Sequence, residues 1–242
     1  MSEPHPAGLP DDRPTPVGSY RHTAVLVAIF LVLAAAGAVF QKAPEPGTAA
    51  GAGHPNVVPL YLSLLAGEWA LVLFVWKRGL AKSGTRLRDL IGGRYRRWQE
   101  VARDLALGCV AWILWLGIQR GLDLWGGADH ARSVGAYLPR GPVEVTLWIA
   151  LSLSAGFCEE TVFRGYLQRQ FAALTRSRPA GLLLQGLLFG IAHGYQGIGA
   201  MVRITLFGLL YGGLALWRGS LRPGMAAHAW SDVYSGWLGV GH

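Results

Sequence analysis

The sequence predicts an all-α fold, a polytopic bundle of about seven transmembrane helices. Of the 242 residues, 52% are hydrophobic and only 15% are charged, and the mean hydropathy is +0.32. A typical soluble domain carries about 25% charged residues. The hydrophobic residues also form blocks of helix-spanning length, separated by Arg, Pro and Gly. This pattern indicates a membrane protein and disfavours a water-soluble enzyme with one large core.

Seven segments are candidate spans, because a helix needs about 20 residues to cross a bilayer. The Ala-rich end of the first segment resembles a signal sequence. This segment is longer than the usual hydrophobic region of a signal and follows a polar lead, so we interpret it as a retained anchor. The predicted spans are residues 23–40, 57–76, 101–118, 143–163, 180–195, 199–217 and 222–240.

The distribution of basic residues predicts the orientation. The formal net charge is +8, and 8 of the 22 Lys and Arg residues lie between the second and third predicted spans. Counted over alternate sides of the seven spans, 15 lie on the N-terminal side and 5 on the other. Lys and Arg accumulate on the cytoplasmic side of membrane proteins, where they contact anionic headgroups. We therefore expect a multi-pass protein of the cell inner membrane with a cytoplasmic N-terminus, and we do not expect nucleic-acid binding.

The last four predicted spans contain ionisable residues, which cost about 2.5–3.5 kcal/mol each at the centre of a membrane helix. Two pairs have a spacing of four residues and therefore share a helix face, Glu160 with Arg164 and His228 with Asp232. Glu159 is rotated about 100° away from Glu160 and can point elsewhere. Carboxylates and imidazoles that converge from different helices can activate water, stabilise an oxyanion or hold a divalent metal. The residues are Glu159, Glu160 and Arg164 on the fourth span, His193 on the fifth, and His228 and Asp232 on the seventh.

Three motifs in this region resemble those of a known family. Glu159-Glu-Thr-Val-Phe-Arg164 matches EExxxR, Phe189-Gly-Ile-Ala-His193 matches FxxxH, and His228-Ala-Trp-Ser-Asp232 matches HxxxN/D. Each motif is weak by itself, but three in this order, each in a hydrophobic segment, are specific. Residues of about 143–240 thus resemble the CPBP family of intramembrane endopeptidases, which includes the type II CAAX prenyl proteases and the bacteriocin-immunity (Abi) proteins.

The resemblance implies a role for each motif residue. Glu159 would be the general base that acts on a water molecule, and His193 would position or polarise that water. His228 and Asp232 would line the site where the oxyanion develops, and Glu160 and Arg164 would support the structure. The substrate would be a membrane-anchored protein or a lipidated tail.

Three points stay open at the level of the sequence. An ionised Asp232 cannot donate a hydrogen bond to an oxyanion, so this residue is protonated, orients His228 or ligates a metal. No cofactor is certain, but Glu159, His193 and His228 can form a zinc set, which would make the protein a metalloprotease. Glu68, in the second span, either reaches the cavity or lies near an interface beside Trp69.

The sequence thus divides into three parts: a disordered cytoplasmic tail over 1–22, N-terminal spans with a basic loop over 23–142, and a catalytic core over 143–242. Peptide-bond hydrolysis is the preferred function. One alternative is a non-catalytic immunity or scaffold protein that binds a partner. An ion or proton carrier is less favoured, because the first two spans supply few polar residues apart from Glu68.

Overall fold

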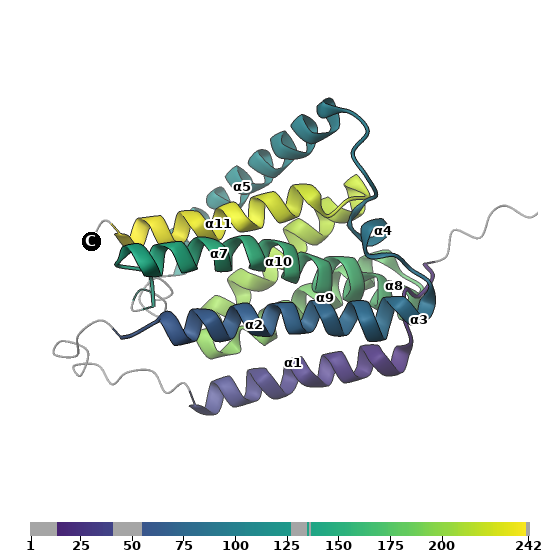
Figure 1. The fold of residues 1–242 in the computed structure, drawn as a ribbon, viewed down its shortest axis with the longest axis horizontal. Helices are drawn as coiled ribbons and strands as arrows, with labels where there is room; N and C mark the ends of the chain where they lie inside the picture. The colour runs from purple at the N-terminus through teal and green to yellow at the C-terminus, as the bar shows by residue number, and fades with distance from the viewer. Residues whose placement is uncertain (1–13, 41–54, 127–134, 136, 241–242) are drawn as a thin grey trace, which may run out of the picture.

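The computed structural model is all-α and describes residues 14–40, 55–126, 135 and 137–240 (Figure 1). Its helices are α1 (Tyr20–Phe40), α2 (Val58–Phe74), α3 (Ala81–Ser83), α4 (Leu87–Ile91), α5 (Trp98–Gly126), α7 (Pro142–Glu159), α8 (Gln168–Thr175), α9 (Arg178–Ala192), α10 (Ile198–Arg218) and α11 (Arg222–Val240). Two π-helical segments, η1 (Val75–Leu80) and η2 (Glu160–Leu167), join α2 to α3 and α7 to α8 without a break, and η3 (Gly194–Gln196) is a short 3-10 turn.

Within the described part of the chain, five helices are long and apolar enough to cross a membrane, namely Tyr20–Val39, Val58–Ser83, Trp98–Leu124, Pro142–Thr175 and Ile198–Arg218. They confirm a multi-pass membrane protein. The other two predicted spans correspond to α9 and α11. The helical part of α9 is only 15 residues long, and α11 is less apolar because it carries the polar motif residues. Leu33, Ile113 and Leu114 are among the exposed large hydrophobic residues, as expected of helices that face lipid.

Helix α7 and its continuation η2–α8 form the centre of the bundle. α11 packs against α7 on one side and α5 on the other, α2 lies along α7, and α9 lies between α8 and α10 (Figure 1). α1 forms the outer edge beside α9. The centre is filled by fully buried aromatic and aliphatic side chains, among them Tyr166, Leu167 and Tyr211.

The N-terminal end of α1 is fixed to α8 by one buried side chain. Gln170 Oε1 accepts hydrogen bonds from the Val17 and Gly18 amides at 2.7 and 3.0 Å, and Gln170 Nε2 donates to Thr23 Oγ1 at 2.7 Å. The helix therefore begins at Tyr20, three residues before the predicted span. Of the predicted disordered tail 1–22, residues 1–13 lie outside the described residues, whereas Val17, Gly18 and His22 are buried against the bundle. The sequence did not predict this contact. The prolines and polar residues of the tail indicate disorder, and the contacting residue, Gln170, is distant in the sequence.

Several helices also continue past the predicted ends of the spans. The second runs to Ser83 and the fourth to Thr175, so that Lys77, Arg78 and Arg169 lie on helix and not in loops. A hydropathy pattern ends where charged residues begin, whereas backbone hydrogen bonds continue into the headgroup region. Arg103 and Arg218 approach buried Asp104, which ties α5 to the end of α10.

A glycine permits a close approach between α7 and α11. A Cβ atom at Gly156 would lie 2.8 Å from both the Ala229 nitrogen and the Met225 oxygen of α11. Gly117 on α5 is the opposite case, because a Cβ there would meet nothing within 4 Å. The α7–α11 distance is thus set by the absence of a side chain at position 156.

We predict that Gly156→Ala lowers stability by about 1–3 kcal/mol, because the added Cβ overpacks a backbone contact that cannot yield. Gly117→Ala serves as the matched control, and it should raise stability by up to about 1 kcal/mol through helix propensity alone. Thermal unfolding of the two variants in the same detergent tests this. A Gly156→Ala protein as stable as the control would contradict it.

Candidate active site

The three motifs meet where η2, α9 and α11 come together. Glu159 ends α7 and Glu160 begins η2, in which the amide of Gln168 bonds to the carbonyl of Phe163, five residues earlier. π-helical turns occur often at functional sites. His228 and Asp232 lie on α11 opposite them, and His193 terminates α9.

Glu160 and Arg164 form a fully buried ion pair. The two side chains have no exposed surface, and Arg164 Nη1 lies 3.4 Å from Glu160 Oε1, as the spacing of four residues predicted. The Arg164 guanidinium also lies over the ring of Phe189, with its carbon 4.2 Å from the ring centroid. This cation–π contact accounts for how the cation is held, because its nitrogens have no hydrogen-bond partner among the described residues.

His228 joins this buried pair to the accessible part of the site. Its Nδ1 lies 3.0 Å from Glu160 Oε1, and since a carboxylate paired with arginine only accepts, the Nδ1–H is the donor. The other ring nitrogen, Nε2, lies 3.6 Å from both Glu159 Oε2 and Asp232 Oδ2. Glu160 therefore fixes the imidazole, and Nε2 faces the two remaining carboxyl groups.

Aromatic rings enclose the imidazole of His228 on its other sides. Its ring centroid lies 4.7 Å from that of Phe207 and 6.4 Å from that of Tyr211, whose plane is parallel within 5°. Only 5% of the His228 side chain is exposed, compared with 22% of Glu159 and 37% of Asp232. The cluster thus has a buried interior, made of Glu160, Arg164 and His228, and an accessible edge made of Glu159 and Asp232.

His193 lies beside this cluster, on the other side of Phe189. Its Nδ1 donates to the carbonyl of Phe189 at 2.8 Å, which leaves Nε2 free to accept in the neutral ring. The Phe189 ring contacts both imidazoles, with centroids 4.9 Å from His193 and 6.3 Å from His228. The glycines of α9 bring it close to α10, since a Cβ at Gly208 would lie 3.0 Å from the Gly186 Cα.

Two residues outside the motifs also lie near the accessible edge. Tyr195, in η3, is within electrostatic range of Glu159 and Asp232, and its ring lies beside that of His193. The motif patterns gave no signal for it beyond its place two residues after His193. Glu68 of α2 lies within range of Glu159, His228 and Asp232. Of the two positions considered for Glu68 from the sequence, the structure shows the one close to the cluster.

Among the residues that the structure describes, no group of three or more His, Cys, Asp and Glu side chains is arranged to hold a metal ion. His193 is the member of the predicted zinc set that no described contact joins to Glu159 or His228. The zinc set of Glu159, His193 and His228 therefore stays a prediction from the sequence.

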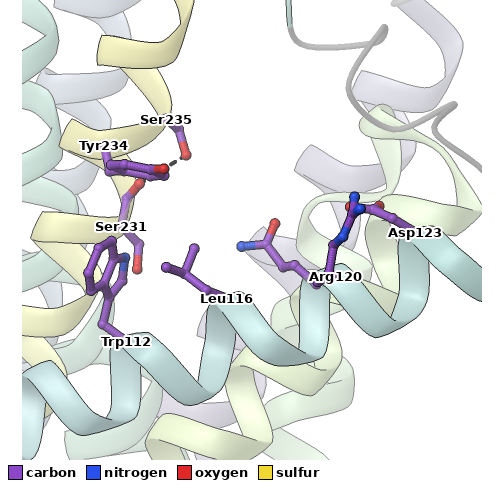
Figure 2. Close-up of a pocket in the computed structure, with 8 residues that line it drawn as sticks. Trp112, Leu116, Arg120, Asp123, Ser231, Tyr234 and Ser235 are labelled. Carbon is purple, nitrogen blue, oxygen red and sulfur yellow. Dashed lines mark hydrogen bonds between the residues drawn. The ribbon is translucent and has the colours of Figure 1, made fainter.

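A pocket of about 400 Å³ lies between α5 and α11 (Figure 2). Trp112, Leu116 and Arg120 of α5 face Ser231, Tyr234 and Ser235 of α11 across it (Figure 2). Asp123 at its end is paired with Arg203 of α10 at 2.8 Å. None of the six ionisable motif residues lines the pocket, so the site is defined by the side-chain cluster and not by this cavity.

Comparison with known proteins identifies the segment that carries the cluster. Residues 141–234 match the family model described as type II CAAX prenyl endopeptidase Rce1-like. The match includes all seven motif residues and confirms the resemblance seen in the sequence, while residues 1–140 lie outside it. No curated protein and no solved structure matches the chain.

The buried pair gives a stability prediction. Arg164→Gln leaves the Glu160 carboxylate buried beside an imidazole alone, and we expect a loss of about 3–5 kcal/mol. The control is Arg88→Gln, which removes an exposed ion pair with Asp89 and should cost at most about 1 kcal/mol. Unfolding of the purified variants measures both. Equal losses of stability in Arg164→Gln and Arg88→Gln would show that Arg164 does not compensate the charge of Glu160. The double variant Glu160→Gln with Arg164→Gln should recover part of the stability lost in Arg164→Gln.

Proposed function

We propose that this Rce1-like chain is an intramembrane endopeptidase that hydrolyses a peptide bond in a membrane-anchored or lipid-modified protein. The observation that supports it most is the position of His228, hydrogen-bonded to buried Glu160 through Nδ1 while Nε2 faces Glu159 and Asp232. A fixed imidazole beside an accessible carboxylate is an arrangement that serves general acid–base chemistry. The family match suggests protein or peptide substrates processed within the membrane.

In the proposed reaction Glu159 acts as the base. Its carboxylate takes a proton from a water molecule as the water oxygen bonds to the scissile carbonyl carbon. The carbonyl oxygen then carries the negative charge. Collapse of this intermediate breaks the C–N bond, and the proton held by Glu159 passes to the leaving nitrogen. Glu159 suits this role because it is the more exposed of the adjacent glutamates and Arg164 does not neutralise it.

His228 and Asp232 would border the position of the oxyanion. With Nδ1–H committed to Glu160, a doubly protonated His228 presents Nε2–H to a developing negative charge. His193, whose Nδ1–H is committed to Phe189, presents Nε2 as an acceptor that can orient the water. Glu160 and Arg164 would act through His228 as positioning residues.

The membrane arrangement that fits this site has seven spans. α9 and α11 carry His193, His228 and Asp232 between helices that are themselves long enough to cross the bilayer, so we propose that both lie within it. Their polar residues face α7 and η2, which reduces the cost of inserting them. The asymmetry of Lys and Arg favours a cytoplasmic N-terminus in the inner membrane.

Glu159→Gln tests the base directly. The amide cannot take a proton, so we expect the rate of cleavage to fall by at least about 100-fold. The assay uses the purified full-length chain in nanodiscs and two reporters, a fluorogenic peptide with a prenylated C-terminal tail and a transmembrane peptide without lipid. Glu100→Gln, the same change in the first turn of α5, is the control and should keep the wild-type rate.

A chelator distinguishes the mechanisms in the same assay. A wild-type rate that survives chelation supports the glutamate mechanism, and loss with recovery on adding zinc would support a metalloprotease. Cleavage by Glu159→Gln at the wild-type rate would show that the base is another residue. If neither reporter is cut while protection of the host from a toxin survives Glu159→Gln, the protein acts by binding.

Asp232 has its own test, because its role depends on whether it must be ionised. If Asp232 lines the oxyanion position, Asp232→Asn provides an amide donor and keeps at least about a tenth of the wild-type kcat, whereas Asp232→Ala loses about 100-fold or more. Measurement of kcat for both variants distinguishes a residue that lines the oxyanion position from one that acts as a carboxylate. Equal losses in the two variants would assign a carboxylate role, such as orienting His228.

A further inference from the structure

Glu68 brings a fourth carboxyl group to the cluster from a helix outside the matched segment. It lies on α2, within electrostatic range of Glu159, Asp232 and His228, and interacts with the hydroxyl of Ser154 on α7. Residues 141–234 contain the other three carboxyl groups, Glu159, Glu160 and Asp232. α2 packs along α7, which ends at Glu159, and also contacts η2, so it is more than a lipid-facing cover.

Packing fixes the position of Glu68. The neighbouring Trp69 stacks on Phe157 of α7, with ring centroids 5.6 Å apart and planes 23° from parallel. Two turns earlier on α2, Tyr61 meets Trp148 of α7 edge to face at 5.4 Å. These contacts hold α2 along α7 on both sides of Glu68, so the direction of its carboxyl follows from the helix pair.

One carboxyl oxygen of Glu68 lacks a partner. Oε2 is buried and has no hydrogen-bond partner among the described residues. Glu160 also has an orphan oxygen, but its carboxylate is held by Arg164 and His228 through Oε1. A buried acceptor without a donor costs about 1–3 kcal/mol, more when it is charged. The Glu68 oxygen thus has an unused capacity to bind a donor beside the proposed base.

A substrate of the proposed reaction carries suitable donors. A peptide that is cut within the membrane must be extended at the scissile bond, and its main-chain N–H groups there lose their helical partners. No lipid atom satisfies them in the hydrocarbon region, so the protein has to do so. A carboxyl oxygen accepts a hydrogen bond from an N–H group, and such a bond to the main chain is independent of the substrate sequence.

We propose that Glu68 is a substrate-binding residue whose Oε2 accepts a hydrogen bond from a main-chain N–H of the peptide held beside Glu159. This inference rests on the proposed endopeptidase function. It assigns α2 the task of holding the substrate backbone, whereas the matched segment supplies the reacting groups.

Binding and catalysis are measured separately to test it. The peptide with the prenylated C-terminal tail is titrated against the full-length chain carrying Glu159→Gln, which does not consume it. Adding Glu68→Leu should weaken binding about tenfold, whereas Glu68→Gln, whose amide oxygen still accepts, should stay within about threefold. Ser63→Leu, at an exposed position of the same helix, is the control and should change nothing.

Backbone esters identify the donor. Replacing each peptide amide in turn with an ester removes one N–H. One position should weaken binding about tenfold when Glu68 is present and have no effect with Glu68→Leu, as expected for two changes that remove one interaction. An equal ester effect in both proteins, or unchanged binding with Glu68→Leu, would overturn the proposal.

The same experiment separates this proposal from the function on which it rests. Binding that depends on Glu68, together with no cleavage by the wild type, would refute the endopeptidase and keep the binding residue. A lower kcat with Glu68→Leu at unchanged affinity would place the Glu68 contact on the water and overturn the proposal. A peptide that is neither bound nor cut by the wild type overturns both for that substrate class.

Discussion

The burial of the Glu160 carboxylate is the constraint on which the rest of the structure depends. An anion with no exposed surface is stable only beside compensating donors and cations. Arg164 supplies one from the same helical face and His228 supplies another from α11. The fold must therefore keep η2 and α11 within hydrogen-bond distance, and the close contact at Gly156 allows it. The interaction that holds two helices together is also the one that orients the imidazole.

Adjacent glutamates consequently have different environments. The rotation between successive helical residues buries Glu160 beneath the aromatic rings and leaves Glu159 partly exposed at the edge. His193 and His228 show a similar division between their two ring nitrogens. In each, Nδ1 donates to an acceptor within the bundle and Nε2 takes no part in that bond. Reactive groups are thus positioned by partners that do not themselves reach the edge.

Local patterns were sufficient to predict the fold class and the composition of the cluster. Helical spacing brings Glu160 to Arg164 and His228 to Asp232, and the motif order indicated that these pairs meet. Contacts between distant segments could not be predicted in this way. The hydrogen bond from His228 to Glu160, the clasp of Gln170 on Val17 and Gly18, and the approach of Glu68 all join residues more than 60 positions apart. The lengths of the helices were also not predicted. Hydropathy falls at the first charged residues, whereas the backbone hydrogen bonds of the helix continue beyond them.

The uninterrupted helix from Pro142 to Thr175 has a consequence for the lipid around it. Its 34 residues span about 50 Å at about 1.5 Å per residue, well beyond a hydrocarbon core of about 30 Å. The end that leaves the core is the polar one, which begins Gln168-Arg169-Gln170. If the headgroups lie at the level of Leu167, the glutamate pair sits about 10 Å beneath them, about two-thirds of the way to the midplane of the bilayer. A helix longer than the core is accommodated by tilting, by kinking or by local thickening of the bilayer, and a tilt would reduce the depth of the carboxylates below the headgroups.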